Sequence, residues 1–92
     1  MRNDDKIKYW LEIAQYDIVS AKAMLETKRY LYVGFLCHQV IEKALKAAVW
    51  ARKKSEPPFT HNLMILAENA DLLAKLNDDQ KLLLSELMPL NI

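Results

Sequence analysis

Apolar residues recur every three or four positions through the first half of the chain, and this spacing predicts two long amphipathic helices. The first should span about residues 4–27, with an apolar stripe made of Ile7, Trp10, Leu11, Ala14, Ile18, Ala21 and Leu25. The second should span about residues 30–53, with a broader apolar arc made of Val33, Leu36, Cys37, Val40, Ile41, Ala44, Leu45, Ala48 and Val49. Because so broad an arc touches neighbours on two sides, we expect the second helix at the centre of a bundle or at an interface.

Prolines occur only after the second helix. Residues 54–60 include Pro57 and Pro58 and predict a loop, because the residue before a proline is disfavoured in the helical region. Thr60 is the last residue of this loop and could cap a third helix over about residues 61–75.

The last helix has the clearest start signal. Asn77 and Gln80 have the spacing of a capping box, and the helix that they begin should end near Pro89. The short link at Lys28-Arg29 makes the first two helices an antiparallel hairpin, and the only glycine, Gly34, indicates close packing near the start of the second helix. The pattern therefore predicts one all-α domain over residues 1–92, an up-and-down bundle of about four helices.

Composition and charge narrow the class of protein. The chain has 92 residues, a formal net charge of +1 and a single cysteine, Cys37. A domain this small has a thin stability margin, which favours self-association. A near-neutral charge excludes attraction of nucleic acid by a global field, and one thiol forms no internal disulfide, as is typical of a reducing cytoplasm. The charged N-terminus is not a signal peptide, and no apolar run is long enough to span a membrane.

The polar positions of the second helix are the candidate chemistry. Gln39, Glu42, Lys43 and Lys46 fall on one face of it, next to His38. Periodicity alone favours a solvated face, on which Glu42 and Lys46 form an exposed pair four residues apart. The alternative is a binding site. Lys43 and Lys46, with Arg52, Lys53 and Lys54 further along, could form a basic patch that meets RNA or a phosphate.

Two further residues could join this face. Asp17 lies at the border of the apolar stripe on the first helix, opposite the stretch from Gln39 to Lys43 in a hairpin. A carboxylate there is costly unless it is paired, so Lys43, Gln39 or His38 should pair with it. His61 lies at the start of the third helix, where a histidine usually serves a cap or a packing contact.

Other kinds of site are not indicated by the sequence. His38 and His61 have no nearby cysteine or aspartate at the spacing of metal ligands, and there is no glycine-rich phosphate loop or paired carboxylate. We therefore expect no metal and no cofactor.

The same residues carry a resemblance to a known family. They are Trp10, Ala14 to Asp17, Ala21 and Leu25, then Arg29-Tyr30, Phe35, His38-Gln39 and Glu42 to Ala47, and finally Pro58, Thr60 to Leu63 and Leu66. In this combination the chain resembles the HEPN domain over about residues 8–70. The resemblance implies a helical bundle that usually forms a homodimer. Many members work with a minimal nucleotidyltransferase in toxin–antitoxin pairs, and many others are metal-independent ribonucleases.

This sequence departs from the ribonuclease pattern of that family. The resemblance implies an arginine and a catalytic histidine with four to six residues between them, but Arg29 to His38 and Arg52 to His61 are both too widely spaced. The arginine-tyrosine pair of a last helix is also missing, so we expect either a degenerate member or a domain truncated at its C-terminus. In a truncated bundle the leucines of the last two helices would need a partner.

Three hypotheses follow. The first is a cytoplasmic, non-catalytic HEPN module, a homodimer that binds a nucleotide, RNA or a minimal nucleotidyltransferase partner and not a membrane. Its ligand-binding residues would be Asp17, His38, Gln39, Glu42, Lys43, Lys46 and His61, with the lysines as point charges for phosphate. The second is a ribonuclease toxin with His61 or His38 as general base. The third is a structural interaction protein whose polar face is only solvated.

Overall fold

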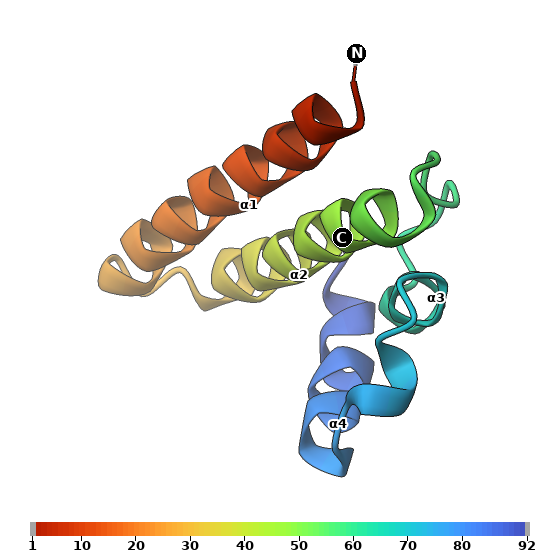
Figure 1. Ribbon diagram of the computed structural model, residues 1–92. Coiled ribbons are helices and arrows are strands. Elements are labelled where there is room, and N and C mark those ends of the chain that lie inside the picture. Colours follow the sequence, from red (N-terminus) through yellow and green to blue (C-terminus); the bar gives the residue numbers. More distant parts are fainter. Residues whose placement is uncertain (1, 92) are drawn as a thin grey trace.

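The computed structural model describes residues 2–91, and every regular element within that range is helical (Figure 1). The α-helices are α1 (Asn3–Glu26), α2 (Tyr30–Lys53), α3 (Leu63–Asn69) and α4 (Asp78–Leu87). Two short 3-10 helices, η1 (Leu73–Lys75) and η2 (Met88–Leu90), precede and follow α4. The predicted all-α fold is therefore confirmed. Within the described range, no helix is both long and apolar enough to cross a membrane.

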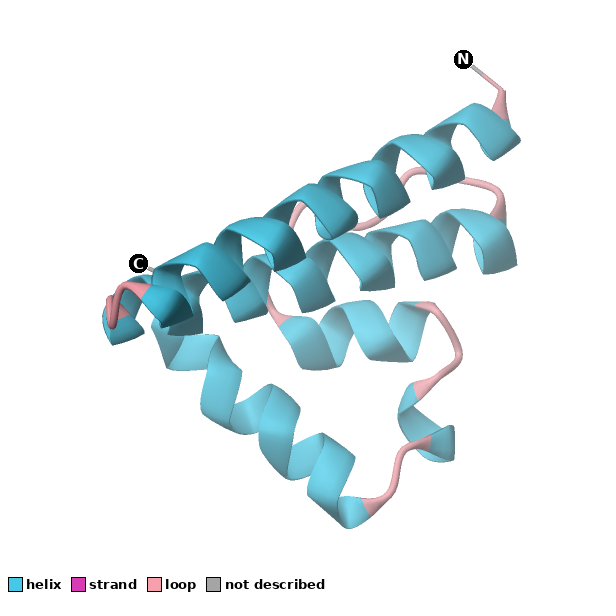
Figure 2. Cartoon of the chain, turned by 90° about the vertical axis from the view of Figure 1, so that its left-hand side faces the viewer, coloured by secondary structure: helices cyan, strands magenta, loops and turns pink. Residues whose placement is uncertain are grey.

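The first two helices form the predicted antiparallel hairpin. In Figures 1 and 2, α1 and α2 lie side by side along their whole length. A tight turn joins them, because Lys28 adopts a left-handed conformation with φ of 60° and the amide of Arg29 donates to the carbonyl of Met24 at 2.8 Å. This bond satisfies one of the carbonyl groups that the end of a helix leaves unpaired. The bounds differ from the predicted ones by one residue in α1 and not at all in α2.

The third helix is shorter than predicted. Asn62, and not Thr60, is its N-cap, since the Asn62 side chain accepts hydrogen bonds from the amides of Met64 at 3.0 Å and Ile65 at 3.1 Å. The helix ends at Asn69, and Asp71 adopts a left-handed conformation with φ of 58°. The prediction of one helix over residues 61–75 was therefore wrong, because apolar spacing does not show where the backbone turns.

The fourth helix begins and ends as predicted. Asn77 accepts from the amide of Gln80 at 2.8 Å, and the Gln80 side chain accepts from the amide of Asn77 at 2.9 Å. This reciprocal pair is the capping box expected from the sequence. The helix gives way to η2 at Met88, directly before Pro89.

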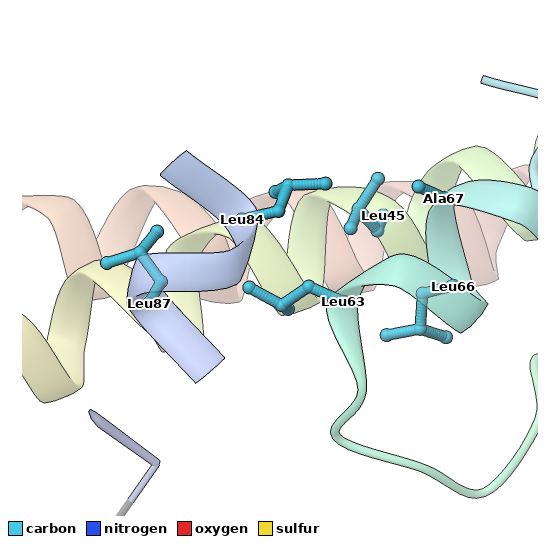
Figure 3. Packing of buried hydrophobic residues seen from close by; sticks show 6 residues of the cluster. All are labelled: Leu45, Leu63, Leu66, Ala67, Leu84 and Leu87. Atoms are coloured by element: carbon cyan, nitrogen blue, oxygen red, sulfur yellow. The ribbon is translucent and has the colours of Figure 1, made fainter. Parts of the chain in front are cut away.

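The main core lies on the side of α2 that faces away from α1. Helices α3 and α4 pack there (Figures 1 and 2), so α2 is the central helix, as its broad apolar arc predicted. Figure 3 shows side chains from α2, α3 and α4 gathered in this core, namely Leu45, Leu63, Leu66, Ala67, Leu84 and Leu87. Burial of each leucine contributes about 2 kcal/mol to stability.

The single glycine allows the end of the chain to pack on α2. A Cβ atom on Gly34 would lie 2.9 Å from Cδ1 of Leu90, which is closer than carbon atoms normally approach. The interpretation of Gly34 as a close-packing position is confirmed. Because Leu90 follows α4, this contact ties the last described residues to the beginning of α2.

The apolar stripe of α1 is only partly covered. Ala14 and Ala21 are buried against α2, but Leu11, Ile18 and Leu25 keep 50%, 37% and 54% of their surface exposed. Helix α1 is therefore rotated so that Ala14 and Ala21 meet α2 while Leu11, Ile18 and Leu25 face outward. This arrangement leaves an apolar surface on the outside of the hairpin.

Candidate functional site: a buried carboxylate between α2 and the start of α3

Glu42 is the centre of the most polar cluster in the described chain. It lies in the middle of α2 on the side that faces α3, and its side chain is completely buried. Its Oε2 atom accepts a hydrogen bond from Lys46 Nζ at 3.0 Å and lies 3.6 Å from Lys43 Nζ. Its Oε1 atom lies 2.9 Å from His61 Nδ1, which comes from the segment before α3. One carboxylate thus joins two lysines of α2 to the loop that follows it.

The partners of Glu42 keep it ionised. Burial by itself would raise the pKa of this carboxyl, but the hydrogen bonds from Lys46 and His61 and the charge of Lys43 together hold it below its ordinary value. Isolated buried charges are very costly, so this cluster is stable only because every carboxylate oxygen has a positive or donating partner. The cluster therefore acts electrostatically as a negative charge enclosed by positive ones.

His38 lies one helical turn before Glu42 and is equally buried. Its Nδ1 atom is 3.7 Å from Glu42 Oε1, beyond hydrogen-bond distance, and neither ring nitrogen makes a hydrogen bond within residues 2–91. Burial lowers the pKa of His38 more than the Glu42 carboxylate and the backbone of His61 raise it. His38 is therefore a neutral imidazole at pH 7, and its ring is closed off from solvent.

The two lysines are shielded by an aromatic ring that the sequence did not single out as part of the site. Lys46 Nζ lies 5.1 Å and Lys43 Nζ lies 6.0 Å from the ring centre of Trp10 on α1, within the range of cation–π attraction. The lysine side chains are only 17% (Lys43) and 13% (Lys46) exposed. Their stems thus line the seam between α1 and α2.

Gln39 connects the cluster to the end of the chain. Its Oε1 atom accepts from Lys43 Nζ at 2.7 Å, and its Nε2 atom donates to Asn91 Oδ1 at 3.0 Å. Asn91 was missed by sequence reasoning, because a residue far along the chain gives no local signal. The structure thus brings together six of the seven predicted ligand-binding residues, which are His38, Gln39, Glu42, Lys43, Lys46 and His61.

Asp17 is the exception. It is half-buried on the side of α1 that faces α2, but within residues 2–91 it makes no hydrogen bond or ion pair with any side chain. The predicted pairing of Asp17 with Lys43, Gln39 or His38 was wrong. Lys43 turns to Gln39 and Glu42, and His38 is fully buried on α2, one turn from Glu42.

Two other interpretations of this helix were also wrong. The face is not solvated, because Glu42 is completely buried and its lysines are nearly so. The basic residues do not form one patch either. Lys43 and Lys46 pair with Glu42, whereas Arg52 and Lys53 contact Asp71 at 2.6 and 3.3 Å. These two contacts hold the pKa of the Asp71 carboxyl below its usual range.

His61 is the one member of the cluster that is open to solvent. Its side chain is 63% exposed, although its Nδ1 atom points at the fully buried Glu42. Across the described residues, no three histidine, cysteine or acidic side chains converge in the way that a metal ion requires. Chemically, the arrangement offers an exposed imidazole held by a carboxylate, beside a surplus of lysine charge.

The fold and the cluster define a small helical domain with an antiparallel hairpin. A buried carboxylate on the second helix of this hairpin holds the segment before α3 through its contact with His61. A family model described as the HEPN domain matches residues 7–92. Because this match covers nearly the whole chain, the protein belongs to the HEPN domain family. No significant match was found among curated proteins or among solved structures.

Proposed function

We propose that this protein is a non-catalytic HEPN module that works as a homodimer and binds a minimal nucleotidyltransferase, as one half of a toxin–antitoxin pair. The observation that carries the homodimer is the uncovered apolar surface of the hairpin. We call it the hairpin face, and it consists of Leu11, Ile18, Leu25, Val33, Val40 and Ala44.

Helical periodicity places the two halves of the hairpin face on the same side of the hairpin. On α1, Leu11, Ile18 and Leu25 are seven residues apart and flank Ala14 and Ala21, which touch α2. On α2, the half-buried Val33, Val40 and Ala44 lie between the arc that meets α1 and the arc that meets the core. In an antiparallel pair these arcs point in the same direction, so the six residues form one continuous surface.

The chemistry and size of the hairpin face favour a second copy of the chain as its occupant. The α2 part of the face carries no charged residue. On α1, Lys22 lies beside Ile18 and Leu25, and its long side chain can keep its amine in solvent when two copies meet. A helix of 24 residues is about 36 Å long, and two helices side by side are about 20 Å wide. The whole side of the hairpin that carries this face therefore has a projected area of about 700 Å², which approaches the roughly 800 Å² per partner of a standard stable interface.

Sedimentation of charge variants tests the homodimer. The wild-type chain should sediment as a dimer at micromolar concentration, and the double variant Leu11→Glu, Ile18→Glu should sediment as a monomer because each copy would bury charges in the interface. The matched control is Tyr16→Glu, since Tyr16 is 75% exposed on the opposite side of α1. A monomeric wild type, or a double variant that remains a dimer, would contradict the homodimer.

Membership of the HEPN family is the support for the nucleotidyltransferase partnership. Coexpression with a minimal nucleotidyltransferase encoded beside this chain should give a complex that elutes as one species from a sizing column. The Tyr16→Glu control and the wild type should both form it. If the two proteins elute separately, the partnership fails while the homodimer stands.

Nucleotide binding at the charge cluster is a second candidate, and one observation favours it. Two lysines face the single carboxylate of Glu42, which leaves one positive charge in surplus beside the exposed His61. A nucleotide phosphate could contact Lys43, the more exposed of the two lysines. ATP or GTP at a hundred times its dissociation constant should raise stability by about 2.7 kcal/mol.

A thermal-shift titration with ATP, GTP and a short single-stranded RNA separates these candidates. Lys43→Gln should lose the shift if the site is present, while Lys8→Gln, an exposed lysine of α1, should keep it. The absence of a shift with all three ligands would leave protein binding as the function of the module.

A further inference from the structure

His61 combines features that are rarely found in one side chain. Its ring is largely exposed, yet one nitrogen is fixed by an atom that no solvent reaches, the Oε1 of Glu42 at 2.9 Å. The segment that carries it is also held on its C-terminal side, where Asn62 caps α3 and the Asn62 amide donates to Thr60 Oγ1 at 3.1 Å. The ring is therefore presented to solvent in one orientation.

The Glu42 carboxylate also selects the tautomer of this ring. An ionised carboxylate only accepts hydrogen bonds, so the hydrogen between the two groups must be on Nδ1 of His61. A neutral imidazole with hydrogen on Nδ1 carries its free electron pair on Nε2. Since Nδ1 points at a buried oxygen, the exposed part of the ring is the opposite edge, which includes Nε2. The nucleophilic atom of the ring is therefore the one that solvent and solutes can reach.

We propose that Nε2 of His61 accepts a phosphoryl group from a small phosphoryl donor of the phosphoramidate class. The electron pair of Nε2 forms a bond to phosphorus, and the bond from phosphorus to the departing nitrogen breaks. The departing nitrogen is already protonated as –NH3+ in the donor, so it leaves as neutral ammonia with the electron pair of that bond. The ring becomes an imidazolium that retains its hydrogen on Nδ1, and Glu42 stabilises the positive charge that has developed there.

The charges around His61 suit this product. The transferred phosphoryl group brings two negative charges, and the imidazolium supplies one positive charge. The surplus positive charge of Lys43 and Lys46 over Glu42 lies on the other side of the same carboxylate. His38, the other histidine, is completely buried and cannot meet a donor. This acceptor site is independent of the hairpin face and of any protein partner.

Phosphorylation of the full chain with potassium phosphoramidate tests the inference. After digestion, mass spectrometry locates the added group on His61 or His38, and 31P NMR distinguishes the Nε2 from the Nδ1 isomer. The same chain unfolded in urea is the reference, because both histidines are exposed there. In the native chain His61 should react at least about tenfold faster than in urea, and only at Nε2, while His38 stays unmodified.

Equal rates in the native and unfolded chain, or the same mixture of isomers in both, would overturn the proposal. His61→Gln should abolish native phosphorylation. Glu42 is a positioning residue, so Glu42→Gln should produce a mixture of the two isomers under conditions in which circular dichroism shows that the variant is folded. If that variant does not fold, the comparison of native and urea-unfolded wild type still decides the question.

Discussion

Glu42 shows most clearly how a single residue can differ from what its sequence pattern indicates. Its position among lysines and a glutamine on one face of α2 is typical of a solvated surface, yet its side chain is completely buried. The difference arises because Lys43 and Lys46 lay their hydrocarbon stems over the seam and bring their charges back to the carboxylate. An analysis of hydrophobic periodicity counts lysine and glutamate as polar residues, so it does not predict that a carboxylate is buried beneath its own lysine partners.

Removing the carboxylate should destabilise the fold. In Glu42→Gln the two lysines and His61 lose their common partner, and breaking a buried charge cluster in this way costs about 3 kcal/mol. Urea denaturation followed by circular dichroism measures the loss. Glu12→Gln serves as the control, because Glu12 makes only an exposed pair with Lys8 at 3.8 Å and should change stability by less than about 0.5 kcal/mol. Similar effects in the two variants would mean that the Glu42 cluster contributes little.

Stability should fall as the solution becomes acidic, in two stages. The pKa of His38 is lowered in the folded chain from its ordinary 6.5. On acidification the unfolded chain therefore binds this proton before the folded chain does, and the free energy of unfolding decreases below pH 6.5. The lowered pKa of Glu42 adds stability above its ordinary 4.5 that is lost as pH falls further. Melting temperatures across this range should therefore decrease less steeply near pH 6 in His38→Leu than in the wild type. Parallel curves would exclude His38 as a source of the dependence.

At the scale of elements, the sequence predicted the long helices well and the short ones less well. The apolar spacing of α1 and α2 continues for six turns, so one atypical residue does not obscure the helical period. The capping box marks the start of α4 directly. Helix α3 has only seven residues, and two candidate caps, Thr60 and Asn62, lie next to its start. Which of them serves depends on where Leu63 enters the core, and a one-dimensional pattern does not contain that information.

Substitution of the two candidate caps separates their roles. Asn62→Ala removes the acceptor of two amide hydrogen bonds at the start of α3 and should cost about 1 kcal/mol, whereas Asn62→Ser should retain most of this stability. Thr60→Ala should cost less, because Thr60 accepts only from the amide of Asn62. Chemical denaturation of the three variants gives the comparison. A larger loss in Thr60→Ala would reverse the assignment of the cap.

For the whole molecule, the fold class and the family could be read from the sequence, but the arrangement of its surfaces could not. The same seven apolar residues of α1 are consistent with a fully buried stripe or with the half-covered one that the structure contains. What decides between them is the rotation of α1 about its own axis, which follows from the small size of Ala14 and Ala21 where the helices touch. The hairpin face is a consequence of that rotation.

The contact between Gly34 and Leu90 also has a consequence for the order in which the chain folds. The α1–α2 hairpin needs only a short turn to close, whereas the last described residues return to α2 across a long stretch of chain, as the separation of 52 positions between Gln39 and Asn91 illustrates. Contacts between distant residues close late because a larger loop must first be ordered. Leu90→Ala should therefore accelerate unfolding and leave the folding rate nearly unchanged, while Ala21→Gly, within the hairpin, should slow folding. Stopped-flow kinetics on the two variants measures both rates. The expected result would mean that the contact of Leu90 with α2 sets the unfolding rate, and so the lifetime of the native state.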